Sequence, residues 1–281
     1  MNDMFTDFSI LGPALIAGIL VAISHVPLGQ QVLARGIVFI DLAIAQVAGL
    51  GVIAAAHFDL PVTGWGAQLA AGAAALGGAI LLTWTERKRP EVQEALIGIL
   101  FVLASTAQIL LLANDPHGGE NLKDLLAGQI LWVSTGQLVR TAILTAAFAL
   151  VWFTWREKLG RIGFYVLFAL VVTASVQLVG VYLVFTTLIV PAVATYRHAK
   201  KRQLLYGYAL AIGSYVVGLA ASLITDLPSS PVIVWAMGVL GLVVHLTGRS
   251  TAHAHVHVHT HAPAPASEVP VHSRQEAGRT A

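Results

Sequence analysis

Apolar residues follow one another along this chain in stretches of about twenty, separated by short polar and charged segments. A helix needs roughly 20 mostly apolar residues to cross the hydrocarbon core of a bilayer. The pattern therefore predicts an all-α membrane protein, a bundle of about eight or nine spanning helices. The predicted spans are residues 8–26, 36–56, 64–84, 95–113, 138–155, 163–195, 204–224 and 232–247.

One of these runs, residues 163–195, is too long for a single straight span and short for two. We expect it to form a broken or re-entrant pair with its break near Gln177 to Gly180, because irregular backbone is tolerated in a membrane where protein buries it. Pro191 lies near the end of the same run. Since proline removes a helical hydrogen bond and clashes with the preceding turn, the helix is predicted to kink or end there.

Charged residues between the runs predict the orientation. Basic clusters at 86–89, 156–161 and 197–202 are expected on the cytoplasmic side, where lysine and arginine accumulate. The acidic loop 115–124 and Asp226 are expected outside. The side on which the N-terminus lies stays open, because the span count is eight or nine.

The segment that starts at Pro191 combines small residues with a basic cluster. We expect it to form a short amphipathic piece at the cytoplasmic surface, suited to transmit force from a soluble partner into the bundle. The residues predicted to couple the membrane helices to that partner are Pro191, Ala192, Thr195, Arg197 and Lys200.

Composition supports a membrane protein and excludes other classes. The chain is 57% hydrophobic and 11% charged, whereas soluble domains carry about 25% charged residues. A net charge of +2 gives no reason to expect nucleic acid as a partner, and the lack of cysteine excludes disulfides and thiolate metal sites. No Gly-x-x-x-x-Gly-Lys-Ser/Thr loop or catalytic side-chain set occurs, so no enzyme is predicted and the energy source is expected on another chain.

The last part of the chain, residues 250–281, differs from the membrane domain predicted for residues 1–249. Its composition cannot bury a core, which predicts a disordered tail on the cytoplasmic side. Histidine occupies every second position in its first part, and imidazole suits zinc, copper and nickel. We expect these side chains to bind metal, although an inert low-complexity tail has the same composition; they are His253, His255, His257, His259 and His261.

Ionisable groups within spans are costly and are therefore candidate functional residues. Asp41 is predicted to face a path for a cation, with Gln46 nearby as a weaker oxygen donor. The alternative is an interfacial aspartate that pairs with Arg35 or caps a helix. His25, at the end of the first run, is either a metal ligand or a histidine hydrogen-bonded at an interface.

Four segments together resemble the membrane permease subunit of zinc and manganese ATP-binding-cassette importers. The segment 35–51 is similar to the early span of that family with its buried aspartate, and 179–191 is similar to the segment before its coupling helix. Residues 226–231 and, more weakly, 124–131 also match. Family members commonly carry Asp-x-x-x-His on the early span, whereas Ala45 follows Asp41 at that spacing here.

The resemblance implies the type II importer fold of the cobalamin importers and a place in the bacterial cytoplasmic membrane. It also implies a homodimer surrounded by lipid, a cytoplasmic ATP-binding-cassette ATPase and an extracytoplasmic metal-binding protein. The cargo is expected to be a divalent metal, with no permanently bound cofactor, and the histidine-rich tail favours zinc over manganese or iron. The alternatives are a metal carrier driven by an ion gradient and a membrane scaffold or sensor with a metal-binding tail.

Overall fold

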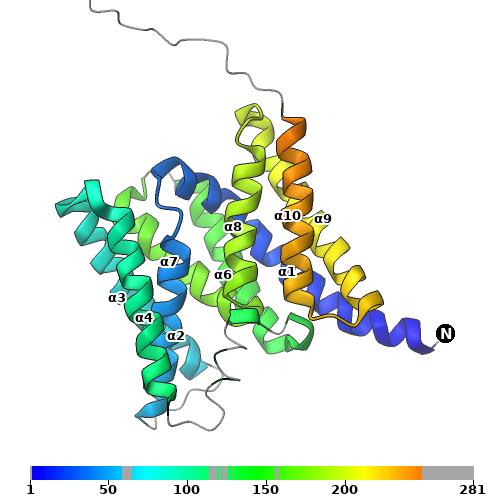
Figure 1. The fold of residues 1–281 in the computed structure, drawn as a ribbon, viewed down its shortest axis with the longest axis horizontal. Coiled ribbons are helices and arrows are strands. Elements are labelled where there is room, and N and C mark those ends of the chain that lie inside the picture. The colour runs from blue at the N-terminus through cyan, green and yellow to red at the C-terminus, as the bar shows by residue number, and fades with distance from the viewer. Residues whose placement is uncertain are drawn as a thin grey trace, which may run out of the picture. The chain divides into compact units, whose positions relative to one another are not determined.

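The computed structural model describes residues 2–58, 65–113, 119, 122, 126–128, 130–155 and 158–248, with side chains from residue 11 onward (Figure 1). Within these residues the secondary structure consists of helices and no strands, which confirms the predicted fold class. The helices are α1 (Asn2–Arg35), α2 (Ile40–His57), α3 (Trp65–Lys88), η1 (Pro90–Val92), α4 (Gln93–Leu112), η2 (Ile130–Trp132), α6 (Thr135–Trp155), α7 (Gly160–Val179), α8 (Val181–Thr195), α9 (Lys200–Thr225) and α10 (Ser229–Thr247).

Eight helical segments among the described residues are long and apolar enough to cross a membrane, and α8 adds a shorter apolar helix. The long run predicted to break does so at Gly180, which separates α7 from α8 and has a φ of 85°. Because this positive φ disfavours residues with a Cβ, glycine permits the chain to reverse within a very short connection. The expected position of the break is therefore confirmed.

The first helix is longer than the sequence predicted. The first apolar run was expected to end at residue 26, just before Pro27, but α1 continues through Pro27 to Arg35. Proline is tolerated inside membrane helices when a neighbouring helix satisfies the freed carbonyl. The predicted end was therefore wrong because the packing around Pro27 outweighs the local preference for a break.

The helix that carries Pro191 also continues past its proline. α8 extends for another turn to Thr195, whose hydroxyl donates a hydrogen bond to the carbonyl oxygen of Pro191 at 2.7 Å. A turn at residues 196–199 then leads directly into α9. The structure thus contradicts both an end of the helix at Pro191 and a separate amphipathic piece after it.

The connections of the bundle divide by charge. Figure 1 shows the α8–α9 connection and the end of α10 at the top of the view, and Gly248, just after α10, lies against Arg197. The α1–α2 and α3–α4 connections also meet, because the Phe39 amide donates to Glu94 Oε1 at 3.2 Å. If α8 is counted as one crossing, successive helices alternate in direction and these basic connections lie on one side of the bundle. That this side is cytoplasmic stays a prediction.

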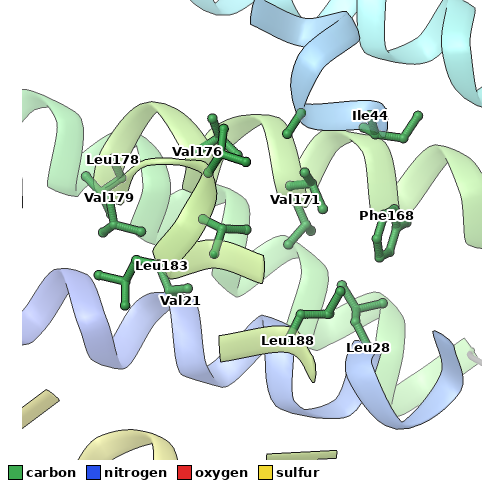
Figure 2. Packing of buried hydrophobic residues seen from close by; sticks show 14 of the residues in the cluster. Val21, Leu28, Ile44, Phe168, Val171, Val176, Leu178, Val179, Leu183 and Leu188 are labelled. Carbon is green, nitrogen blue, oxygen red and sulfur yellow. The ribbon is translucent and has the colours of Figure 1, made fainter. Parts of the chain in front are cut away.

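The core lies where α7 is surrounded by other helices. Figure 2 shows Phe168 and Val171 of α7 near Ile44 of α2, and Leu183 and Leu188 of α8 beside α1. Apolar residues occupy every face of α7, as expected for a helix that is buried all round. This helix therefore forms the framework against which the elements carrying the candidate site pack.

Candidate functional site

The carboxylate of Asp41 is the strongest candidate in the membrane domain. Asp41 lies in the first turn of α2 and its side chain is fully buried. Neither of its carboxylate oxygens has a hydrogen-bond partner among the described residues. A buried carboxylate without partners is costly, although the N-terminal end of a helix offsets part of this cost. Such an exception to polar satisfaction points to function.

Neither structural alternative for Asp41 is realised. The guanidinium of Arg35 lies 4.0 Å from the centre of the Phe164 ring rather than in an ion pair with Asp41. Within the described part of the chain, the salt bridge found joins Arg89 to Glu91 at the surface. The Asp41 side chain makes no capping hydrogen bond to the backbone either. Its burial is therefore not explained by a local structural role.

Gln46 is directed toward a different helix. Nε2 of Gln108, in α4, donates to both the backbone oxygen of Gln46 at 2.9 Å and its side-chain Oε1 at 2.7 Å. Gln46 lies five positions after Asp41, so the two side chains are about 140° apart around α2. Gln46 would have to leave Gln108 to assist Asp41, and its role as an oxygen donor stays a prediction.

His25 is fully buried in α1 and is held in one orientation. Its Nδ1 lies 3.0 Å from the carbonyl oxygen of Val21, and Nε2 has no partner among the described residues. A backbone carbonyl accepts only, so Nδ1 carries the proton when this bond forms and Nε2 presents its lone pair. This is the form in which histidine binds a metal.

The predicted ligands do not assemble into a complete metal centre. No group of three or more histidine, aspartate or glutamate side chains suited to hold a metal occurs in the described part of the chain. Asp41 offers two unpartnered carboxylate oxygens from α2, and His25 offers one unpartnered ring nitrogen from α1. Such a sparse set of donors is suited to brief contact with a passing cation rather than to tight binding.

Two further polar groups on α7 were not proposed as ligands from the sequence. Thr173 Oγ1 and Gln177 Nε2 are buried without partners in the described residues, and they lie one helical turn apart. Their i, i+4 spacing within an apolar run was a usable signal. They add polar groups to the most enclosed helix of the bundle.

The residues predicted to couple to a soluble partner divide into two groups. Pro191, Ala192 and Thr195 are buried within α8. Arg197, on the connection to α9, and Lys200, the first residue of α9, are exposed. Only the exposed part of this segment is available to a partner. The five tail histidines and the predicted boundary at residue 249 lie outside the described residues.

Comparisons with known proteins show which families and proteins this chain is similar to. The model of the ABC 3 transport family matches residues 7–164 and 156–248. The "Probable metal transport system membrane protein" of Chlamydia muridarum is 26% identical over 255 residues, which cover 82% of this chain and 86% of that protein. The manganese transport system membrane protein MntC of Halalkalibacterium halodurans is 26% identical over 261 residues, 85% of this chain and 87% of MntC.

A solved structure has the same fold. The structure of PsaBC from Streptococcus pneumoniae in complex with Fab matches with a TM-score of 0.73 and 22% identity, covering 90% of this chain and 98% of that chain. The resemblance noted from the sequence is confirmed by the family match. The chain belongs to the ABC 3 transport family and is a multi-pass transport subunit of the bacterial inner membrane, with ATP hydrolysis on a separate partner.

Proposed function

We propose that this permease imports a divalent transition metal ion into the bacterial cytoplasm, and that zinc is its cargo in preference to manganese or iron. The names of two relatives, a metal transport protein and a manganese transport protein, support a metal ion as the cargo. The five alternating histidines of the tail support zinc, because imidazole is a preferred zinc ligand. Family membership favours an ATP-driven importer over the gradient-driven carrier and the scaffold or sensor.

The unpartnered carboxylate of Asp41 carries the proposal. A cation that passes Asp41 supplies the positive charge that no neighbouring side chain among the described residues offers to this buried carboxylate. The Nε2 lone pair of His25 offers a nitrogen ligand elsewhere in the bundle. Water fills the remaining coordination positions as the ion moves, so the permease need not hold the metal as a resident cofactor.

The permease works with three kinds of partner in this proposal. A second copy of the chain completes a homodimer in lipid, and an extracytoplasmic metal-binding protein delivers the ion. A cytoplasmic ATP-binding-cassette ATPase docks at the exposed, basic surface formed by Arg197 of the α8–α9 connection and Lys200 at the start of α9. Exposed apolar side chains on the span helices, such as Leu110 and Trp235, support contact with lipid.

Substitution of Asp41 tests the proposal. In vesicles with the complete transporter, Asp41→Asn should reduce uptake of zinc and manganese to the background of vesicles without permease, while the protein remains folded. Asp226→Asn is the matched control, because Asp226 is exposed and its φ of 55° is one that asparagine adopts readily. Unchanged uptake of both metals in Asp41→Asn would refute the cation path.

The choice of metal needs its own measurement. Radioactive zinc and manganese should be offered separately and in competition to the same vesicles. We expect zinc to enter faster at equal concentration and to suppress manganese uptake. Preferential uptake of manganese would retain the metal importer and reject zinc as its cargo.

A further inference from the structure

The turn at the beginning of α2 takes one hydrogen-bond acceptor from elsewhere in the molecule. The first amide groups of a helix have no acceptor within that helix. Serine, threonine, aspartate or asparagine often satisfies one of them from the N-cap position. Here Phe39 is at the N-cap and no side-chain capping bond forms. The Ile40 amide donates to the carbonyl oxygen of Ile37 within the turn, and it is the Phe39 amide that takes an acceptor from a distant part of the chain.

Glu94 supplies that acceptor from another helix. Its Oε1 accepts a hydrogen bond from the Phe39 amide at 3.2 Å, across 55 positions of the chain. Glu94 also lies in the first turn of its own helix, α4. One carboxylate thus lies at the N-terminal ends of two helices, and both ends stabilise negative charge.

The beginning of α4 is itself held in place. Gln93 donates from Nε2 to the carbonyl oxygen of Leu82 at 3.0 Å, and its Oε1 accepts from the Thr85 hydroxyl at 2.9 Å. Both bonds fix the start of α4 against the end of α3. Glu94 is consequently a firm attachment point for the α1–α2 turn.

We propose that Glu94 is a positioning residue for the transport path: through its hydrogen bond to Phe39 it sets the orientation of the first turn of α2 and hence of Asp41. Asp41 is two residues beyond Phe39, so a change in this turn alters the direction of its carboxylate. Glu94 makes no contact with the ion in this role. The inference rests on the proposed function of Asp41.

Two substitutions of Glu94 separate the effect of side-chain length from the effect of charge. Glu94→Gln keeps an oxygen at the same distance and removes the charge, whereas Glu94→Asp keeps the charge and shortens the side chain by about 1.5 Å. Positioning predicts that the glutamine variant retains at least about half of wild-type zinc or manganese uptake, and that the aspartate variant loses about tenfold. Normal uptake by Glu94→Asp with loss in Glu94→Gln would overturn the inference, because charge alone would then matter.

Hydrogen exchange gives a readout that does not depend on transport. In the intact transporter, amides of the α1–α2 turn and the start of α2 should exchange about tenfold faster in Glu94→Asp than in wild type. Glu94→Gln should stay close to wild type. Glu91→Gln is the matched control, because Glu91 is exposed and its ion pair is with Arg89. Unchanged exchange in Glu94→Asp would overturn the inference.

Metal uptake by the same vesicles distinguishes the positioning role of Glu94 from the proposed role of Asp41. If Asp41→Asn is inactive while Glu94→Asp transports normally, the positioning role is wrong and the proposed function stands. If Asp41→Asn transports normally, the proposed role of Asp41 in the cation path is wrong, and a positioning role that serves Asp41 is wrong as well.

Discussion

The hydroxyl of Tyr208, in α9, donates a hydrogen bond to the carbonyl oxygen of Ile23 in α1 at 3.1 Å. Ile23 lies four positions before Pro27, which has no amide hydrogen to offer that carbonyl. The tyrosine therefore replaces the bond that proline removes. This contact explains how α1 continues through Pro27 to Arg35.

Removing this hydroxyl should weaken the bundle. Tyr208→Phe leaves the Ile23 carbonyl without its donor, and we expect a loss of about 1 kcal/mol in the free energy of unfolding. The measurement is unfolding of the purified protein in detergent micelles. Tyr182→Phe is the control, because Tyr182 is 51% exposed. Equal stability of the two variants would contradict the role of Tyr208.

The break between α7 and α8 should not tolerate a side chain. Gly180 has φ 85° and ψ 161°, a region that is essentially restricted to glycine, and a Cβ there would overlap the backbone of Gly128. We expect Gly180→Ala to lower the free energy of unfolding by about 1–3 kcal/mol and to impair uptake.

Gly213→Ala provides the comparison for Gly180→Ala. Gly213 lies within α9 and a Cβ there meets no atom within 4 Å. Alanine should therefore keep or raise stability, by about 0.5–1 kcal/mol. Thermal unfolding of both variants would show the contrast, and a harmless Gly180→Ala would refute the constraint.

The proposed ATPase site can be tested by crosslinking. Cysteine at exposed Arg197 or Ala199 should capture the ATPase subunit in assembled transporter, as detected by a shift in mass. Cysteine at Ala194 should not, because Ala194 is 2% exposed within α8. Absence of capture at both exposed positions, with transport intact, would exclude this connection as the docking site.

The histidine-rich tail should bind zinc reversibly without selecting the cargo. Binding requires neutral imidazole, whose ordinary pKa is about 6.5, so protons displace zinc as the pH falls through that value. Deleting residues 250–281 should leave the preferred metal unchanged and alter uptake at high zinc concentration. A truncated permease that imports a different metal would show that the tail belongs to the transport path.

The sequence predicted features that local chemistry determines. Long apolar runs predicted the spans, and the length of the run 163–195 predicted a break near Gln177 to Gly180. The ABC 3 resemblance was visible from a few motifs. Pro191 misled the prediction of a helix end, and α1 continues beyond the apolar run that ends at residue 26. A proline in the sequence indicates the loss of a hydrogen bond but does not indicate which neighbour compensates for that loss.

Contacts between distant helices could not be predicted in the same way. In the sequence, nothing distinguishes Glu94 from the other charged residues near Pro90. Only the fold places it within hydrogen-bond distance of Phe39. Gln108 and Gln46 are 62 positions apart, and nothing local indicates that they pair. The burial of Asp41 was predictable from its span, whereas its lack of a partner depends on where Arg35 turns.

The length of α8 affects how the bilayer insulates this part of the protein. With 15 residues α8 is about 22 Å long, whereas the hydrocarbon core is about 30 Å thick. Other parts of the protein cover the N-terminal end of α8, because Val179 and Val181 are buried and Gly180 lies against the backbone of Gly128. Packed protein in place of lipid therefore forms the low-dielectric surroundings at the start of α8.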